Sequence, residues 1–280
     1  MRTSLVTCTW NRAKQLNYGM LSVITQELPP NEIVVVDDGS QDNTFQVFAE
    51  LEEKANKKGI EMKYIYLHHP EARISSIPRN IGFKQSTGDV VFFSEPEMLH
   101  VGETIRQALE VITRDHTPLA TQIWTMGQKI WEKLDEEYFI HPARVLSHEY
   151  AMLVSGNMQN TKAPDSDWGI TGSNDCFAGC FFGVKRDWFE ELGGFDEKMT
   201  GHGYEDWDLL HRLSIYGKPV EHRNDIVVIH QWHTKNYPYN IYDHAEKNGT
   251  ISENRIKEGK FRVNEEGWGK YDNESTNNNI

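Results

Sequence analysis

Two adjacent carboxylates, Glu205 and Asp206, lie between a glycine-rich loop and an apolar run with helical spacing. The N-terminus of a helix carries partial positive charge, and this charge favours the ionised form of a carboxylate. An ionised carboxylate is the group that a general base for an alcohol needs. Capping is the commoner use of Asp and Glu at this position, so on their own these two residues favour a structural role. The paired glycines 193–194 open the same stretch and permit a tight turn there.

Acidic residues also follow two apolar runs that are typical of strands buried on both faces of a sheet. Glu95 and Glu97 flank one residue directly after one of these runs, and two carboxylates at this spacing can bind one divalent cation together. Asp37 and Asp38 end the other run in the same way. Acids in solvated loops are the alternative, and a lone Glu-x-Glu is weak support for a metal site.

The elements that carry these residues alternate between strand and helix. Short β-rich or continuous apolar runs predict strands, and apolar residues at helical spacing predict helices. The predicted strands cover residues 4–9, 32–36, 62–67, 90–93, 177–184 and 226–229. Two predicted helices cover about residues 13–26 and 44–57, and a third lies around residues 105–112. Three more are predicted from where they begin: a short helix after Gly82, one that starts at residues 185–189 and one after Asp206. This alternation predicts a doubly wound parallel sheet, in which ligands bind at the carboxyl ends of the strands.

Two segments do not follow this pattern. Residues 124–150 hold either further helices or loops that cover a site. Residues 155–173 are rich in Gly, Ser, Asn, Asp and Pro, which is typical of a loop, and they include an isolated Trp168. Ordinary packing is one role for Trp168. An indole over a sugar-binding cleft is the other, because aromatic faces stack well on the C–H surfaces of sugars.

The chain of 280 residues is long enough for one large α/β domain or for two small ones. No stretch has the composition of a linker between two independent domains, so we predict a single domain over residues 1–245. Residues 246–280 are polar and end in an Asn-rich stretch. We predict that this extension has few anchors on the domain.

Composition narrows the class of protein. The formal net charge of −13 argues against nucleic acid or an anionic membrane as the main partner. The three cysteines, Cys8, Cys176 and Cys180, do not have the spacing of a disulfide framework or a zinc site. No charged and apolar leader precedes the first predicted strand, and no apolar run is long enough to span a bilayer. We therefore expect a soluble, cytoplasmic protein without a membrane span.

The order of these strand-end sites resembles the GT-A glycosyltransferases, and most closely family 2 of the nucleotide-sugar transferases. The resemblance extends over about residues 3–235 and depends on the order of its motifs. These motifs are Thr9–Arg12, Glu32–Ser40, Arg79–Gly82, Thr87–Asp89, Glu95–Glu97, Gly193–Glu197 and Gly203–Asp206. The later half is also similar to chondroitin polymerases and to galactosyl- and N-acetylgalactosaminyltransferases. The resemblance implies an α/β fold of the GT-A (Rossmann-like) type, with a mixed, mostly parallel sheet flanked by helices.

The resemblance also implies roles for the residues of the donor site. Asp38 would accept a hydrogen bond from the nucleotide base, most often uracil. Arg79 would make a second contact, since a guanidinium suits a carbonyl or a phosphate. Thr9 and Glu95 would complete the nucleotide-sugar site.

A divalent metal belongs to the same implied site. Glu97 and His230 would hold Mn²⁺ or Mg²⁺ against the diphosphate, and His233 is the alternative histidine ligand. The family's Asp-x-Asp is replaced here by Glu-Pro-Glu, so each carboxylate sits one methylene farther out. This departure leaves the metal dependence open.

On the acceptor side, the resemblance implies that Asp206 takes the proton from the acceptor hydroxyl as it attacks the anomeric carbon, with Glu205 beside it. One base and a direct displacement give inversion. The residues expected to contact the acceptor are Trp168, Trp207 and His233.

Taken as a whole, the resemblance implies an inverting glycosyltransferase with a UDP-sugar as donor and a glycan or another hydroxyl compound as acceptor. Among the possible acceptors we expect a polysaccharide, so the predicted process is polysaccharide biosynthesis. Residues 1–100 would form the nucleotide-binding half, and residues 101–245 the acceptor-binding and catalytic half. Two alternatives stay open: a GT-A module that binds a sugar or nucleotide without catalysis, and a nucleotidyltransferase.

Overall fold

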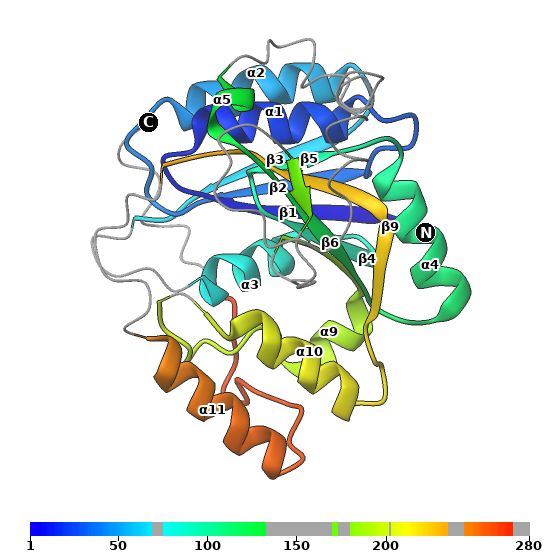
Figure 1. Ribbon diagram of the computed structural model, residues 1–280, viewed down its shortest axis with the longest axis vertical. Coiled ribbons are helices and arrows are strands. Elements are labelled where there is room, and N and C mark those ends of the chain that lie inside the picture. Colours follow the sequence, from blue (N-terminus) through cyan, green and yellow to red (C-terminus); the bar gives the residue numbers. More distant parts are fainter. Residues whose placement is uncertain (69–74, 133–169, 173–179, 202, 235–243, 271–280) are drawn as a thin grey trace.

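The computed structural model describes residues 1–68, 75–132, 170–172, 180–201, 203–234 and 244–270. Within these ranges the strands form one nine-stranded sheet (Figure 1). The strands are β1 (Thr3–Thr9), β2 (Glu32–Asp37), β3 (Glu61–Tyr66), β4 (Val90–Ser94), β5 (Met98–His100), β6 (Leu119–Met126), β7 (Ile170–Gly172), β8 (Phe181–Lys185) and β9 (Glu221–His230). Their order is β3-β2-β1-β4-β8-β6-β9-β5, and β7 pairs with β6.

The directions of the strands make this sheet mixed. β1, β2, β3 and β4 pair in parallel, and β6 and β9 point the same way on the other side of the antiparallel β8. β5 and β7 also run against that direction. The sheet is therefore mixed and mostly parallel, as the family resemblance implies, and not wholly parallel. Periodicity marks a strand but carries no information on its direction, so the strand–helix alternation alone cannot identify β8 as antiparallel.

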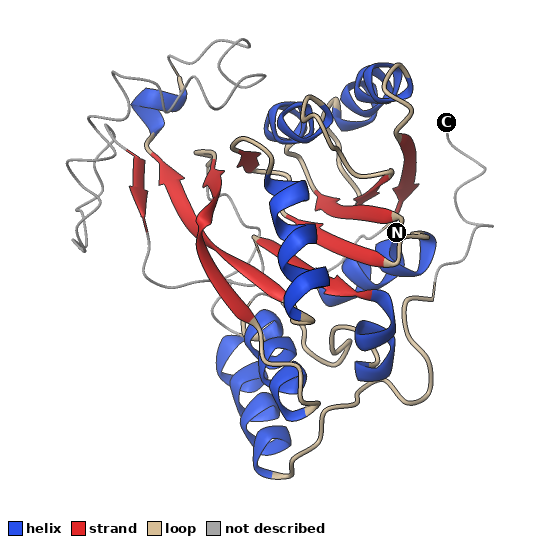
Figure 2. Ribbon diagram, turned by 90° about the vertical axis from the view of Figure 1, so that its right-hand side faces the viewer, coloured by secondary structure: helices blue, strands red, loops and turns tan. Residues whose placement is uncertain are grey.

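Helices cover both faces of the sheet (Figure 1, Figure 2). They are α1 (Ala13–Ile24), α2 (Thr44–Asn56), α3 (Ser76–Gln85), α4 (Thr104–Asp115), α5 (Gln128–Trp131), α9 (Arg186–Leu192), α10 (Glu205–Ile215) and α11 (Ala245–Lys257). Leu5 and Phe92 join the apolar layer that contains α1, α2 and α4. Their neighbours Val6 and Phe93 join the layer that contains α3, α9 and α10. Both faces of the inner strands are thus buried, which explains the continuous apolar runs in the sequence.

The described helices include none that combines the length and apolar character needed to cross a membrane.

Four strands differ from the sequence expectation. The sequence predicts neither β5 nor β7, and β7 lies within residues 155–173, whose composition indicates a loop. The other two are β6 and β9. Residues 119–126 form β6, although the sequence predicts no strand there. Most of β6 is buried, but Thr121 and Gln122 interrupt its apolar run. The sequence therefore lacks the continuous apolar pattern of a buried strand at this place. β9 begins at Glu221, five residues before the predicted apolar run. Its first half is largely exposed and polar, so the apolar pattern does not reveal it.

Helix α3 also differs, and its position matters for the site. The sequence places the short helix after Gly82, whereas the structure begins it at Ser76. Pro78 fits within the first helical turn, where its missing N–H has no helical acceptor. Arg79 therefore projects from a helix with fixed backbone geometry, and not from a loop.

The C-terminal segment is anchored as far as residue 270, contrary to the expectation of few anchors. α11 packs against α10. Val263 is buried, and the Trp268 ring lies 5.6 Å from that of Phe83 and 5.8 Å from that of Phe189. These anchors are isolated apolar residues in polar surroundings, and for this reason no periodic pattern reveals them. Residues 271–280 lie outside the described residues.

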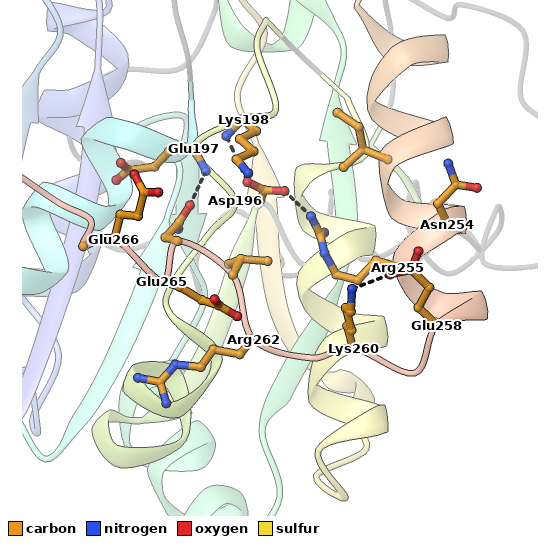
Figure 3. Close-up of a pocket in the computed structure, with 14 residues that line it drawn as sticks. Asp196, Glu197, Lys198, Asn254, Arg255, Glu258, Lys260, Arg262, Glu265 and Glu266 are labelled. Atoms are coloured by element: carbon orange, nitrogen blue, oxygen red, sulfur yellow. Dashed lines mark hydrogen bonds and ion pairs between the residues drawn. The ribbon is translucent and has the colours of Figure 1, made fainter.

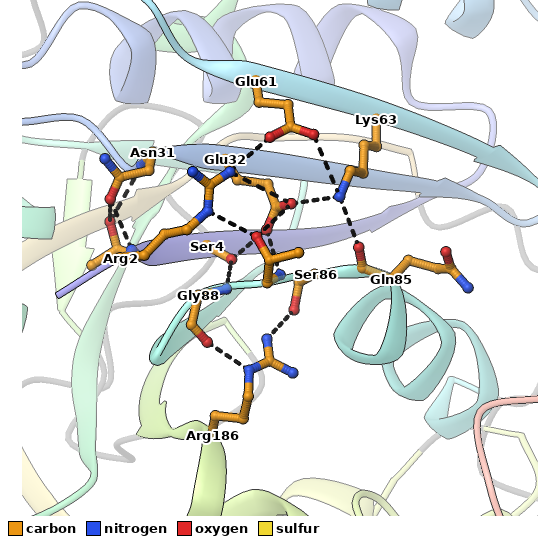
Figure 4. Close-up of polar contacts among 12 residues, drawn as sticks. Arg2, Ser4, Asn31, Glu32, Glu61, Lys63, Gln85, Ser86, Gly88 and Arg186 are labelled. Atoms are coloured by element: carbon orange, nitrogen blue, oxygen red, sulfur yellow. Dashed lines mark hydrogen bonds and ion pairs between the residues drawn. The ribbon is translucent and has the colours of Figure 1, made fainter.

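A buried carboxylate organises the edge at which the parallel strands begin (Figure 4). Glu32 is fully buried and accepts hydrogen bonds from Lys63 Nζ at 2.7 Å and from Thr87 N at 2.8 Å. Burial raises the pKa of Glu32, but the bonds from Lys63, Ser4 and Thr87 bring it below its usual value. Gly88 N in turn donates to Ser4 Oγ at 2.7 Å. The motif that contains Thr87 and Gly88 is therefore structural.

Candidate active site

Most of the predicted site residues lie at the opposite edge, where the parallel strands end. Thr9 ends β1, Asp37 ends β2 and His230 ends β9, and the residues Glu95 and Glu97 form the turn from β4 to β5. Because β1, β2, β4 and β9 run in the same direction, their carboxyl ends lie along one edge of the sheet. Ligands of such sheets bind at that edge.

Arg79 brings three predicted carboxylates together. Its Nη2 lies 2.6 Å from Glu95 Oε1, and its Nη1 lies 3.4 Å from both Glu205 Oε1 and Asp206 Oδ1. The guanidinium carbon lies 5.3 Å from the centre of the Phe195 ring, which forms one wall beside it. The fork geometry of a guanidinium allows it to hold several oxygens at once, so Arg79 fixes the relative positions of these acids.

Glu205 and Asp206 have different surroundings. Glu205 is only 2% exposed, and its two oxygens accept hydrogen bonds from Gly203 N at 2.8 Å and Ser75 Oγ at 3.1 Å. The Asp206 side chain is 22% exposed. Glu205 therefore braces the loop before α10, and Asp206 is the carboxylate that a substrate can reach.

The charges around Arg79 set the protonation of this group. Burial lowers the pKa of Arg79, but Asp206, Glu95 and Glu205 together hold it well above its usual value. Burial raises the pKa of Asp206 to about 7, with Arg79 opposing the shift and Glu205 and Glu95 adding to it. The pKa is therefore raised, whereas the position at a helix N-terminus favours a lower one, because burial of the carboxylate dominates. A base whose pKa lies near the working pH is well suited to take a proton from a hydroxyl.

Asp38 and Thr9 stand at the ends of neighbouring strands. Asp38 is buried, and its backbone N donates to Thr9 O at 2.9 Å. The buried Thr9 Oγ1 has no hydrogen-bond partner among the described residues, so it can accept a bond from a ligand. Burial raises the pKa of the Cys8 thiol near the end of β1. The charge of Arg79 opposes this shift, and the charges of Glu95 and Asp38 add to it.

Asp37 has a structural role, unlike its neighbour Asp38. Its Oδ1 accepts a hydrogen bond from Ser40 N at 2.7 Å, and its Oδ2 accepts one from the Tyr64 hydroxyl. Burial raises the pKa of Asp37, although these bonds oppose the shift. Of these two neighbouring acids, Asp37 therefore closes the turn after β2, and Asp38 lies beside the site.

Glu97 belongs to a second cluster, formed with Arg12 and His233. Arg12 Nε lies 3.0 Å from Glu97 Oε1, and Arg12 Nη2 lies 3.0 Å from His233 Nδ1. His233 Nε2 is 3.8 Å from Glu97 Oε1, and the His230 ring is 5.2 Å from the His233 ring. Arg12 Nη2 also donates to Thr234 O at 3.2 Å, which ties the segment after β9 to the start of α1.

The donor groups of this cluster fit a divalent metal in kind. Glu97 Oε2 is buried and lacks a hydrogen-bond partner within the described ranges, so one carboxylate oxygen is available to a cation. Burial lowers the pKa of His233, with Arg12 and His230 adding to the shift and Glu97 opposing it, which favours the neutral imidazole that metals bind. In the part of the chain that the structure describes, no three His, Cys, Asp or Glu side chains gather closely enough to hold a metal alone. A metal here would therefore share its coordination with substrate phosphates.

The sequence motifs name Arg12 but do not predict its place in this cluster. The resemblance implies Glu97 with His230 and leaves His233 as the alternative; in the structure the His233 Nε2 lies 3.8 Å from Glu97 Oε1. Arg12 closes the Thr9–Arg12 motif directly before α1, which was the available signal. Its partners come from far along the chain, and no local pattern identifies them.

The predicted acceptor residues have separate positions. Trp207 is exposed at the start of α10, directly after Asp206, and Tyr204 is exposed directly before the helix. His233 lies in the Glu97 cluster. Trp168 lies outside the described residues. Two exposed aromatic residues thus adjoin Glu205 and Asp206 in sequence, and the Trp207 ring stacks on the His211 ring with their centres 6.1 Å apart.

The loop of the Gly193–Glu197 motif braces the site and does not carry its chemistry. Asn80, the neighbour of Arg79, accepts a hydrogen bond from Phe195 N at 2.9 Å and donates to Phe195 O at 2.9 Å. Asn264 Nδ2 donates to the same carbonyl at 2.6 Å. These bonds hold the Phe195 ring beside the Arg79 guanidinium.

A cavity of about 690 Å³ adjoins the other residues of this loop, and α11 and the segment after it complete its walls (Figure 3). None of the residues proposed for the donor, the metal or the base lines it. The candidate active site is therefore the edge where the strands end, and not this cavity.

Two family models match the chain. The model of glycosyl transferase family 2 matches residues 4–193, which is more than half of the chain. The model of the N-terminal domain of galactosyltransferase matches residues 162–234.

Several curated proteins are similar in sequence. YfnE of Bacillus subtilis (strain 168), described as an uncharacterized glycosyltransferase, is 23% identical over 84% of this chain and 66% of its own length. Chondroitin synthase of Pasteurella multocida (strain Pm70) is 22% identical over 76% of this chain and 23% of its own length. The poly(ribitol-phosphate) beta-N-acetylglucosaminyltransferase TarS of Staphylococcus aureus is 29% identical over 42% of this chain and 20% of its own length. The chain thus spans less than two thirds of the length of each of these relatives.

Solved structures share the fold at low sequence identity. The structure of S. aureus TarS 1-349 in complex with UDP gives a TM-score of 0.59 at 17% identity, over 92% of this chain and 65% of that chain. The mannosyltransferase PcManGT from Pyrobaculum calidifontis, in complex with GDP-Man and Mn²⁺, gives a TM-score of 0.54 at 17% identity, over 84% of this chain and 58% of that chain. These likenesses confirm the predicted GT-A fold.

The motif order, the mixed sheet and the length of the family match agree with one another. The resemblance to family 2 that the motifs indicate is thereby confirmed. The chain belongs to glycosyl transferase family 2.

Proposed function

We propose that this domain transfers a sugar from a nucleoside diphosphate to an acceptor hydroxyl with inversion, with Asp206 as the general base. The observation that carries the proposal is the position of Asp206. It is the accessible member of a carboxylate pair, Arg79 holds it at the strand-end edge, and its pKa is raised to about 7. At that pKa the carboxylate can take the acceptor's proton as the oxygen attacks the anomeric carbon, and a single displacement inverts the configuration.

The donor site extends from Asp38 to Glu95. Asp38 would accept a hydrogen bond from the base, and Thr9 Oγ1 offers a further buried polar atom beside it. Arg79 keeps its positive charge among three carboxylates, and it would contact the sugar or the phosphates from the Glu95 side. A UDP-sugar is our proposed donor, which is in keeping with the UDP bound by the structurally similar TarS.

A divalent cation, Mn²⁺ or Mg²⁺, would be held by Glu97 together with His233 or His230. When bound, such a metal neutralises negative charge on the leaving nucleoside diphosphate. Glu97 supplies a buried oxygen for it, and Arg12 holds the other oxygen of that carboxylate in place. The Mn²⁺ in the PcManGT complex supports a metal in this fold.

The acceptor would approach Asp206 from the side of the exposed aromatic residues. Trp207 adjoins the base at the start of α10, and Trp168 and His233 are proposed to contact the acceptor as well. An exposed aromatic side chain such as Trp207 suits a glycan, because the C–H faces of sugars pack against aromatic rings. Synthesis of a polysaccharide or another glycan in the cytoplasm is the proposed setting.

A donor screen with the purified protein tests this function. UDP-, GDP- and dTDP-sugars are offered with Mn²⁺ and a panel of hydroxyl acceptors, and release of nucleoside diphosphate and transfer of the sugar are measured. We expect sugar transfer from a UDP-sugar with inverted configuration. Binding of the nucleotide without any turnover would support a binding module, and release of pyrophosphate from a nucleoside triphosphate would support a nucleotidyltransferase. Either result would contradict the proposal.

A further inference from the structure

The described chain continues beyond both family matches, which end at residues 193 and 234, into helix α11 and the segment to residue 270. α11 packs against α10, the helix that begins with Glu205 and Asp206 (Figure 1). The contacts of α11 with α10 and with residues 196–203 before it include buried ion pairs and hydrogen bonds. They connect α11 to the candidate active site by two separate routes.

Arg255 of α11 makes the first connection (Figure 3). Its Nη1 donates to Asp208 Oδ1, and its Nη2 donates to Asp196 Oδ2. Each of the two carboxylates is only 1% exposed. A buried carboxylate is costly unless it is paired, so a single guanidinium that serves both acids fixes them relative to each other.

Each of these acids leads to a residue of the proposed reaction. Asp208 lies two residues after Asp206 in α10, and its other oxygen is held by Arg212 Nε at 2.6 Å. Asp196 directly follows Phe195, whose ring lies beside the Arg79 guanidinium at 5.3 Å. Arg255 therefore restrains both the helix that carries the base and the wall beside Arg79.

The second connection fastens the loop before Glu205. Asn248 Nδ2 in α11 donates to Thr200 O at 3.0 Å and to Gly203 O at 2.9 Å. Gly249 lies so close to the Tyr204 ring that a Cβ there would be 3.1 Å from a ring carbon. α11 thus holds the two ends of the turn that leads into the catalytic helix.

We propose that Arg255 is a positioning residue for the transfer reaction, which acts through Asp208 and Asp196 to aim Asp206 at the acceptor and to keep Arg79 in place. The inference rests on the proposed function for its catalytic consequence. A residue with only a structural role would change the stability of the protein. A positioning residue also changes the turnover of the folded enzyme and the pH at which its base titrates.

The test compares Arg255→Gln with Arg262→Gln, which removes an exposed arginine of the segment after α11 that pairs with Glu191 at 3.7 Å. A misplacement of about 1 Å by a mutation away from the chemistry can cost about a hundredfold in rate. We expect kcat of Arg255→Gln to fall by about ten- to a hundredfold, with donor affinity within about twofold of the parent. The acid limb of its pH profile should also move, and the control should match the parent in all three measurements.

Two further variants separate positioning from simple loss of folding. Arg255→Lys keeps the positive charge but loses the planar guanidinium that can bind two carboxylates, so this variant should fold and show an intermediate kcat. If Arg255→Gln does not fold, Arg255→Lys takes its place in the test. The double variant Asp196→Asn with Arg255→Gln completes a double-mutant cycle. Because the two residues act on the site through one ion pair, their effects on kcat should be clearly non-additive.

Amide hydrogen exchange provides a readout that does not depend on catalysis. The amides of Gly203 and Asp208 lie on either side of the base, and we expect both to exchange faster in Arg255→Gln than in Arg262→Gln. Parental exchange, kcat and pH profile in Arg255→Gln would overturn the inference and leave the proposed function standing. If the parent transfers no sugar with any donor, the proposed function fails, and the exchange rates alone decide whether Arg255 holds this loop.

Discussion

Burial and hydrogen bonding give adjacent residues different tasks at two places in this site. Glu205 accepts bonds from Gly203 N and Ser75 Oγ and is enclosed, whereas Asp206 has an exposed edge and a raised pKa. Asp37 in the same way closes a turn through Ser40 N, and Asp38 adjoins the strand-end site. The motifs locate both pairs in the sequence. Each pair has one local partner and one from another segment, Ser75 for Glu205 and Tyr64 for Asp37, so the fold contributes to the choice within a pair.

The pKa of Asp206 predicts a pH dependence of the proposed transfer. As pH falls below about 7, a growing fraction of Asp206 is protonated and can no longer take the acceptor's proton. We therefore expect kcat/KM for the acceptor to rise with pH through this range and to fall by about tenfold per pH unit on the acid side, because this ratio reports the pKa of the free enzyme. The measurement is kcat/KM against pH. A ratio that stays constant from about pH 5 to about pH 8 would argue against Asp206 as the titrating base.

Asp38 is expected to contribute to nucleotide binding. Asp38→Ala should weaken the affinity for UDP by about 1.5–3 kcal/mol, which is typical of one hydrogen bond to a charged group. Asp225→Ala is the matched control, because Asp225 is exposed and pairs with Arg223 in the first half of β9. Titration calorimetry gives both affinities. Unchanged UDP affinity in a folded Asp38→Ala protein would remove Asp38 from the donor site.

At the scale of elements, helix α3 and the Gly193–Glu197 loop position the site together. α3 carries Arg79 toward the carboxylates, and its next residue, Asn80, bonds to both backbone groups of Phe195. The motif residues around Gly194 were identified from the sequence, but their task was not, because it depends on contacts with α3 and with residues 263–268. The helical start at Ser76 was also missed, since a proline in a short segment indicates a turn as readily as a first helical turn.

Gly194 tests how tightly this loop is fitted. Its φ is +73°, and a Cβ there would lie 2.5 Å from Asn80 Oδ1 and 2.7 Å from the Trp268 ring. Gly217 has a similar φ of +84° with nothing within 4 Å of the added Cβ, so it isolates the cost of the backbone conformation. We expect Gly217→Ala to lose about 1–2 kcal/mol of unfolding free energy and Gly194→Ala about 1–3 kcal/mol more. Chemical denaturation measures both, and equal losses would mean that the loop is loosely packed.

At the scale of the whole molecule, the site joins segments from the beginning and the end of the chain. The sheet and most of its helices follow from apolar periodicity and from motif order, which are local properties. Local patterns do not predict the role of Arg12, the strand β6 or the helix α11. Arg12 depends on partners near residue 233, and polar residues interrupt β6. Contacts of Arg255 and Asn248 hold α11 in place. These features arise from contacts between distant segments, and a local pattern does not record them.

Metal use belongs to this scale, because the Glu97 cluster draws on the start of α1, the β4–β5 turn and the exit from β9. We expect Glu97→Gln to raise the Mn²⁺ concentration needed for half-maximal activity at least about tenfold, since it removes the negative charge that the cluster offers a cation. Glu110→Gln, at an exposed glutamate of α4, is the control. Mn²⁺ titrations of binding and of activity give the result. If the parent remains active after exhaustive chelation, the metal assignment is wrong, and Arg12 becomes the residue that offsets the charge of the diphosphate.

The assignment of Asp206 as the base is the central claim, and Asp206→Asn tests it most directly. The substitution is nearly isosteric but cannot take a proton, so turnover should fall by about a hundredfold to ten-thousandfold. Donor affinity and unfolding free energy should stay close to those of the parent, because Glu205 still braces the loop through Gly203 N. The measurement is kcat for sugar transfer under conditions where chemistry limits the rate, beside the donor affinity of the same preparations. Turnover of Asp206→Asn within a few-fold of the parent would contradict the account and move the search for the base to Glu205 or Asp208.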